Sequence, residues 1–135
     1  MNKKTGGFPK AERLCSRYLI DKIFEPGQSK SLLAFPIRMV YRVADKPDKG
    51  QYRGNDDNAL LISVPKRYFK HAVDRNRVKR LVREAYRNNR ELIKLPEGKV
   101  VNIAMVWIDA KHHPANVVNK KICNLLRRMS EKENQ

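Results

Sequence analysis

Residues 72–88, AVDRNRVKRLVREAYRN, place apolar and basic side chains on opposite faces of a single helix. At about 100° per residue, Val78, Leu81, Val82 and Ala85 fall on one face. The other face carries basic and amide side chains: Asn76, Lys79, Arg80, Arg83 and Arg87. Guanidinium groups are always charged and can bind two phosphate oxygens at once. The segment therefore favours a polyphosphate partner. The alternative is a solvated amphipathic helix, but the exposed face of such a helix normally mixes both signs of charge.

The whole chain carries the same sign of charge. Its 135 residues include 30 Lys and Arg against 14 Asp and Glu, which gives a formal net charge of +16. A charge of this size predicts a polyanionic partner and salt-sensitive association. No apolar run approaches the roughly 18 residues that a membrane span needs, and the N-terminus lacks the apolar segment of a signal peptide. We therefore expect a cytoplasmic protein with no membrane partner. Of the candidate polyanions, an anionic membrane surface is the weakest, and nucleic acid and an acidic protein remain.

The rest of the pattern predicts one α+β domain. Helices are expected at residues 16–25 and 115–130 in addition to the basic helix, and strands at 35–43, 59–64 and 99–108. The basic helix then lies between two strands, as in an α/β sandwich with helices packed on a small sheet.

The core of this single domain is expected at about residues 12–130. Outside it we expect a flexible basic arm at 1–11, a mobile turn-rich loop at 44–58 and a polar, frayed tail at 131–135. Cys15 and Cys123 each lie in a helical pattern beside apolar residues, which favours two buried thiols over a disulfide.

The sequence offers no constellation for catalysis by the polypeptide. Its acidic residues are scattered, whereas a two-metal nuclease needs converging carboxylates. Two distant cysteines and the pair His112-His113 do not supply the four ligands of a zinc site, so we predict no catalytic residue and no metal ligand. Tyr68-Phe69 is flanked by basic residues on both sides, a pattern typical of proteins that bind single-stranded nucleic acid.

Residues 62–87, ISVPKRYFKHAVDRNRVKRLVREAYR, closely resemble the signature of the protein subunit of bacterial ribonuclease P. The centre, RNRVKRLVR at residues 75–83, matches that family's RNR motif without a break. The approach SVPKR at 63–67 and the step Ala72-Val73 match as well. The expected first helix ends in IFEPG at 23–27, the apolar-Phe-x-x-Gly ending of the family. The resemblance covers about residues 12–130.

The resemblance implies a fold and a function. The family fold is an α/β sandwich of order αβββαβα, with a left-handed βαβ crossover that contains the RNR helix, against the usual right-handed rule. The family's enzyme removes the 5′ leader from precursor tRNA, and its catalyst is an RNA subunit that holds the magnesium ions. The chain is thus expected to be a protein cofactor of an RNA enzyme, with the RNA subunit and precursor tRNA as partners and no obligate protein partner.

The resemblance also implies roles for particular residues. The RNA-binding set lies on and before the RNR helix: Lys66, Arg67, Arg75, Asn76, Arg77, Lys79, Arg80, Arg83 and Arg87. The leader is expected in a cleft between the first helix and the sheet, with Ile20, Phe24, Arg38 and Tyr86. Phe24 matches an aromatic residue of that cleft. Ile20 and Arg38 stand where some relatives carry aromatics, and we expect Arg38 to contact phosphate instead.

Three other functions fit parts of this pattern. A structural RNA-binding protein of the ribosomal or assembly-factor type shares the charge and size, and only the RNR signature argues against it. A DNA-binding protein could use the basic helix in a major groove, although apolar residues anchor this helix along its length. A free-standing ribonuclease would need the carboxylate cluster that the sequence does not show.

Overall fold

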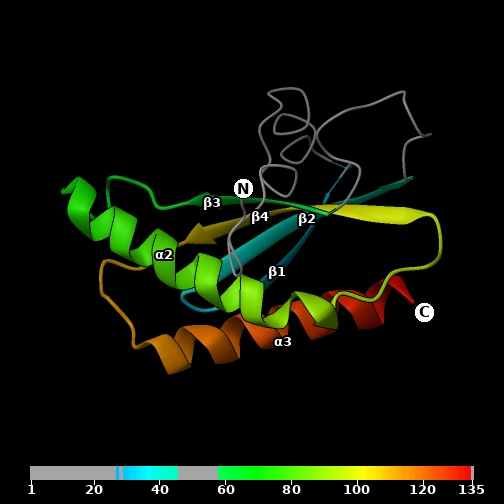
Figure 1. The fold of residues 1–135 in the computed structure, drawn as a ribbon. Coiled ribbons are helices and arrows are strands. Elements are labelled where there is room, and N and C mark those ends of the chain that lie inside the picture. The colour runs from blue at the N-terminus through cyan, green and yellow to red at the C-terminus, as the bar shows by residue number, and fades with distance from the viewer. Residues whose placement is uncertain (1–26, 28, 46–57, 135) are drawn as a thin grey trace, which may run out of the picture.

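A computed structural model of the chain describes residue 27 and residues 29–45 and 58–134. These residues form a mixed α+β domain with a four-stranded sheet of order β1-β2-β4-β3 (Figure 1). The antiparallel pairs are β1–β2 and β2–β4, and β3–β4 is parallel. In chain order the elements are β1 (Lys30–Ala34), β2 (Ile37–Asp45), β3 (Ala59–Ser63), α2 (Ala72–Asn89), the 3-10 helix η2 (Arg90–Leu92), β4 (Lys99–Trp107) and α3 (Ala115–Glu133). The helix expected at residues 16–25, the arm at 1–11 and Cys15 lie outside the described residues.

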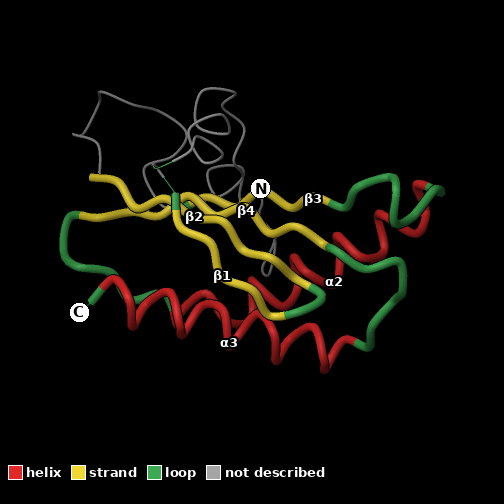
Figure 2. Tube along the Cα trace, turned by 180° about the vertical axis from the view of Figure 1, so that it is seen from behind, coloured by secondary structure: helices red, strands yellow, loops and turns green. Residues whose placement is uncertain are grey.

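Both long helices cover the same face of the sheet and lie next to each other (Figures 1 and 2). Alternate strand residues point to that face because side chains alternate along a strand. The core lies between the two layers and is formed by side chains from all of them, including Met39, Met105, Val82 and Leu125. Trp107 of β4 is fully buried.

The basic helix lies in a parallel crossover. The chain leaves β3, runs through α2 and returns in β4, which pairs with β3 in parallel register from Ala59–Asn102 to Ser63–Val106. This agrees with the βαβ unit that the family resemblance implies. The left-handed sense of the crossover stays a prediction.

The first strands differ from the sequence expectation. The predicted strand at 35–43 begins instead with the turn Phe35-Pro36, which joins β1 to β2 and has a cis peptide bond. The pairing of Ala34 with Ile37 makes these elements a tight hairpin. At its far end β2 continues to Asp45, which pairs with Lys99 of β4 in register and through an ion pair 2.5 Å long. The loop expected at 44–58 therefore starts two residues later, and residues 46–57 lie outside the described part.

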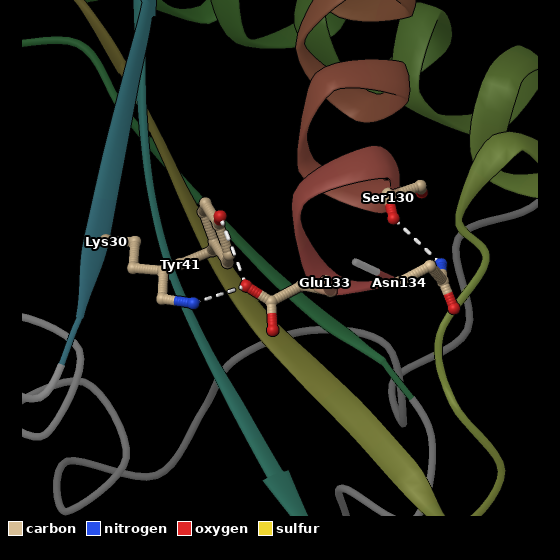
Figure 3. Close-up of polar contacts among 5 residues, drawn as sticks. All are labelled: Lys30, Tyr41, Ser130, Glu133 and Asn134. Carbon is tan, nitrogen blue, oxygen red and sulfur yellow. Dashed lines mark hydrogen bonds and ion pairs between the residues drawn. The ribbon is translucent and has the colours of Figure 1, made fainter.

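The C-terminal tail is not frayed as expected, because α3 continues through residue 133. The Glu133 carboxylate accepts hydrogen bonds from Lys30 Nζ at 2.8 Å and from the Tyr41 hydroxyl at 3.4 Å (Figure 3). The Asn134 side chain donates to the carbonyls of Lys94 and Ser130. These contacts tie the last turn of the helix to the sheet and to the segment before β4. Cys123 is a free thiol, as expected, but it is only half-buried.

Candidate nucleic-acid interface

The apolar face of α2 is buried as the sequence predicts, whereas only Asn76, Arg80 and Arg83 of the predicted basic face are exposed. Val78, Val82 and Ala85 are buried in the core, and Leu81 is partly buried against it. The exposed side carries Asn76, Arg77, Arg80, Arg83 and Glu84. The apolar face fixes the helix on the sheet, so the arginines on the other face have a defined orientation toward solvent.

Three arginines form the centre of this exposed face. Among the described residues, Arg77, Arg80 and Arg83 make no ion pair or hydrogen bond. Arg87 differs, because it is half-buried and forms an ion pair with Glu84 one turn earlier. We call Arg77, Arg80 and Arg83 the arginine row. Its charges are not neutralised by neighbouring carboxylates, which leaves them available for an anionic ligand.

Arg75 has a different role within the same motif. Its guanidinium donates to the carbonyl oxygens of Phe69 at 3.0 Å and Lys70 at 2.9 Å. These bonds hold the segment that leads into α2 against the first turn of the helix. Arg75 therefore has a structural role in addition to the RNA-binding role that the resemblance implies.

The approach to α2 adds further positive charge. Lys66 and Arg67 are exposed, and the Arg67 guanidinium lies 4.9 Å from the centre of the Tyr68 ring, a cation–π contact. Lys79 is half-buried. Lys66 and Arg67 thus lie in the segment that leads into α2, and Lys79 lies on the helix itself.

The N-terminus of α2 is anchored by the loop before α3. Asp74 lies in the first turn, where its charge suits the helix dipole, but the helix has no side-chain cap. The Asp74 carboxylate lies 3.3 Å from His112 Nε2, and the His112 ring stacks on Phe69 with centroids 4.6 Å apart. The loop that carries His112 therefore packs against the start of α2.

The structure contradicts one residue of the predicted leader cleft. Tyr86 was placed in that cleft, but its side chain is fully buried in the core between the helices and the sheet. It follows Val82 by four positions and so shares the apolar face of α2, a signal that helical periodicity already contains. Ile20 and Phe24 lie outside the described residues. Arg38 is exposed on β2.

Arg38 lies on the sheet face that α2 and α3 do not cover, which we call the open face with respect to the described residues. Because Met39 and Tyr41 point into the core, Arg38, Val40 and Arg42 point to the opposite face. Arg42 is half-buried there; the sequence pattern alone did not indicate it as a site residue, although its spacing of four from Arg38 predicts the same face. Between the two arginines lie small apolar residues, with Ala104 and Ala59 buried and packed against Val40 and Leu61.

Hydrogen bonds from neighbouring bases lower the pKa of two carboxylates: one from His113 lowers the pKa of Asp109, and one from Lys99 lowers the pKa of Asp45. Within the described ranges, no three His, Cys, Asp or Glu side chains gather closely enough to hold a metal ion. Neither α2 nor α3 is long and apolar enough to cross a membrane.

Comparisons with known proteins agree with this geometry. The family model "Ribonuclease P" matches residues 8–131. The "Ribonuclease P protein component" of Porphyromonas gingivalis (strain ATCC 33277) is 44% identical over 89 residues, which are 66% of this chain and 59% of that protein. The match thus spans less than two thirds of that relative's length. The protein of the same description from Desulforapulum autotrophicum is 31% identical over 125 residues, 93% of this chain and 91% of that one.

A solved structure is also similar. It is the RNase P protein from Thermotoga maritima in complex with 1-(4-fluorophenyl)-2-thiourea. It has 27% sequence identity and a TM-score of 0.57, and the similarity covers 82% of this chain and 92% of that chain. The similarity therefore covers most of the chain and is not confined to the RNR motif.

Proposed function

The chain belongs to the ribonuclease P family of protein components, and we propose that it is the protein cofactor of a ribonucleoprotein that removes the 5′ leader from precursor tRNA. The observation that carries this proposal is the arginine row of α2, which has no carboxylate partner among the described residues and lies on a helix fixed by its buried face. A cytoplasmic location remains part of the proposal.

The two basic surfaces point to two RNA ligands. The arginine row lies on the helical side of the molecule, whereas Arg38 and Arg42 lie on the open face of the sheet. A protein that contacts its own RNA subunit and the leader at once needs two separate surfaces. We assign the arginine row, with Lys66, Arg67, Asn76 and Lys79, to the RNA subunit and the open face around Arg38 to the leader.

The mechanism is electrostatic. A catalytic RNA and a precursor tRNA both carry dense negative charge and repel each other. Guanidinium groups held between them lower that repulsion, so the protein raises the affinity for substrate and reduces the magnesium concentration that full activity requires. The polypeptide itself makes no covalent step.

Magnesium would be held mainly by the RNA subunit. Mg²⁺ prefers carboxylate oxygens and water, whereas the exposed face of α2 is cationic and the described residues hold no cluster of potential ligands. These residues do not fit a magnesium site, and none of the steps above depends on one in the protein.

The test is cleavage of a 5′-labelled precursor tRNA at low magnesium by the cognate RNA subunit, with and without the protein. We expect strong stimulation at the mature 5′ end and no cleavage by the protein alone. Tight RNA binding without stimulation would instead favour a structural RNA-binding protein. Cleavage by the protein alone would indicate a free-standing ribonuclease.

A charge-reversed pair shows whether the arginine row or the overall charge matters. R80E/R83E is expected to weaken binding of the RNA subunit severely while leaving the circular dichroism spectrum intact, because both side chains are exposed. The matched control is K120E/R127E, which changes the net charge equally at two exposed positions of α3. A much smaller effect of the control is expected. Equal effects of the two variants would refute a specific surface on α2.

A further inference from the structure

The loop before α3 carries two adjacent histidines with different partners. His113 Nε2 lies 2.7 Å from Asp109 Oδ2 in the same loop, and its ring meets the edge of buried Trp107 with centroids 5.4 Å apart. His112 instead stacks on Phe69, with centroids 4.6 Å apart and the two rings 28° from parallel. His113 therefore fixes the loop to the end of β4, and His112 connects that loop to the segment before α2.

The segment that His112 contacts presents part of the basic surface. We call residues 64–71, between β3 and α2, the entry segment. The Phe69 ring belongs to the hydrophobic core, so its stack with His112 ties the entry segment to the loop before α3. The position of this segment sets where its basic side chains lie relative to the arginine row. Its exposed basic residues are Lys66, Arg67 and Lys70.

His112 also connects the entry segment to the helix. Its Nε2 lies 3.3 Å from Asp74 Oδ1, and Asp74 belongs to the first turn of α2, which has no side-chain cap. A neutral imidazole offers one N–H donor, whereas an imidazolium adds an ion pair with the carboxylate and places a cation against the Phe69 ring. Histidine side chains ordinarily change charge between about pH 5 and 8. The connection is therefore stronger at the acidic end of this range.

The other charged groups around His112 do not take the place of Asp74. Of these groups only Asp109 is a carboxylate, and it is engaged by His113. Asp74 is thus the carboxylate that the described residues place within ion-pair distance of His112. The remaining titratable or charged groups of the loop, the entry segment and the first turn of α2 are Asp109, Lys111 and His113, then Lys66, Arg67, Lys70 and His71, and finally Arg75.

We propose that His112 is a positioning residue for RNA binding: through Phe69 and Asp74, its imidazolium holds the entry segment and the first turn of α2 in the arrangement that binds the RNA subunit. When the imidazole is neutral, the ion pair is absent and this arrangement is less populated. The apparent affinity falls by the same fraction. This inference rests on the proposed function, in which the entry segment and the arginine row both contact the RNA subunit.

The test measures the affinity of the full-length protein for the cognate RNA subunit between about pH 5 and 8. Wild-type affinity should fall about two- to fivefold as pH rises, the effect of one partly exposed ion pair. His112→Phe keeps a ring on Phe69 and removes the titrating group, so its affinity should vary much less with pH. Asp74→Asn keeps a hydrogen-bond acceptor and removes the charge, and it should flatten the profile as well. The double variant should match either single variant in its pH dependence.

His71→Gln is the matched control, because His71 is an exposed histidine of the entry segment. It should keep the wild-type profile. If His71→Gln flattens the profile and His112→Phe does not, a protonated His71 contacts the RNA and the proposal is wrong. If His112→Phe flattens the profile but Asp74→Asn does not, His112 acts through its own charge on the RNA and not by positioning α2, which also overturns the proposal.

Failure of this proposal is distinguishable from failure of the proposed function. If the wild type stimulates cleavage by the RNA subunit but its affinity does not vary with pH, only the positioning role of His112 is refuted. If the wild type neither binds the RNA subunit nor stimulates cleavage, the proposed function fails, and the role of His112 fails with it. Circular dichroism at each pH checks the fold of every variant, and Asp74→Asn gives the same readout if His112→Phe does not fold.

Discussion

Arg75 and Arg80 are both arginines of α2, but the structure gives them different tasks. Arg75→Ala should lower the free energy of unfolding by about 1 to 2 kcal/mol, because it removes two hydrogen bonds from a charged donor that is partly exposed. Arg80→Ala should change stability by less than about 0.5 kcal/mol, since the side chain is exposed. Urea unfolding of both variants measures the difference. Equal losses of stability would contradict the structural role of Arg75.

Tyr41 makes stability depend on alkaline pH. Burial, followed by the charge of Glu133 and a hydrogen bond to it, raises the pKa of Tyr41 from 10.0 to about 12. Between these values the unfolded chain releases the proton while the native chain keeps it, so stability falls as pH rises. Below pH 10 the contribution is fully present.

Tyr41→Phe removes the hydroxyl and keeps the ring. The variant should lose stability less steeply than the wild type as pH rises from 10 to about 12. Urea midpoints across that window measure both slopes, and the comparison cancels the titration of lysines common to the two proteins. The same slope in both proteins would show that other groups cause the pH dependence.

Residue patterns predicted side-chain direction better than side-chain role. The apolar face of α2 followed from spacing alone, and the same rule places Tyr86 in the core, where its predicted leader contact is not possible. Arg75 shows the other limit. Its use of the Phe69 and Lys70 carbonyls depends on how the preceding segment folds back, which no periodicity in the sequence describes.

Ser130 connects two elements that are distant in the chain. Its hydroxyl donates to the Leu92 carbonyl and accepts from the Lys94 amide, both at 2.9 Å, so the end of α3 holds the segment between α2 and β4. Ser130→Ala should cost about 1 to 3 kcal/mol because it leaves a donor and an acceptor without their partner. Glu131→Ala, at an exposed neighbour, is the control. Thermal or urea unfolding that does not separate the two variants would refute this connection.

Element boundaries were predicted where local signals are strong. The basic helix, expected at 72–88, runs over Ala72–Asn89, and the strand expected at 99–108 ends one residue early. β1 was missed because the five residues KSLLA show no clear alternation and the turn follows at once. The end of α3 was misplaced because the contacts of Glu133 with Lys30 and Tyr41 join residues far apart in sequence.

At the scale of the molecule, charge predicted the class of ligand but not the surface that binds it. The full sequence has a net charge of +16, and its basic residues occur on both described helices and on the strands as well as outside them. The fold then separates these charges, with the arginine row on the helical side and Arg38 on the open side of the sheet. This separation depends on which face of the sheet the helices cover, which the order of elements in the sequence does not specify.

Salt dependence tests this separation quantitatively. Each phosphate contact that forms on binding releases counterions, so the logarithm of affinity falls by about 0.7 to 0.9 per contact for each tenfold rise in salt. If Arg80 and Arg83 each meet a phosphate of the RNA subunit, the double variant R80A/R83A should have a slope shallower by about 1.4 to 1.8 than the wild type.

The control K120A/R127A removes the same charge from exposed positions of α3 and should leave that slope almost unchanged. The binding of the RNA subunit is measured over a range of monovalent salt at fixed magnesium, so that only the protein contacts differ between samples. If the two double variants shift the slope equally, binding depends on the overall field of the protein and not on the arginine row. If neither shifts it, Arg80 and Arg83 make no phosphate contact, and the RNA subunit must be held through other residues.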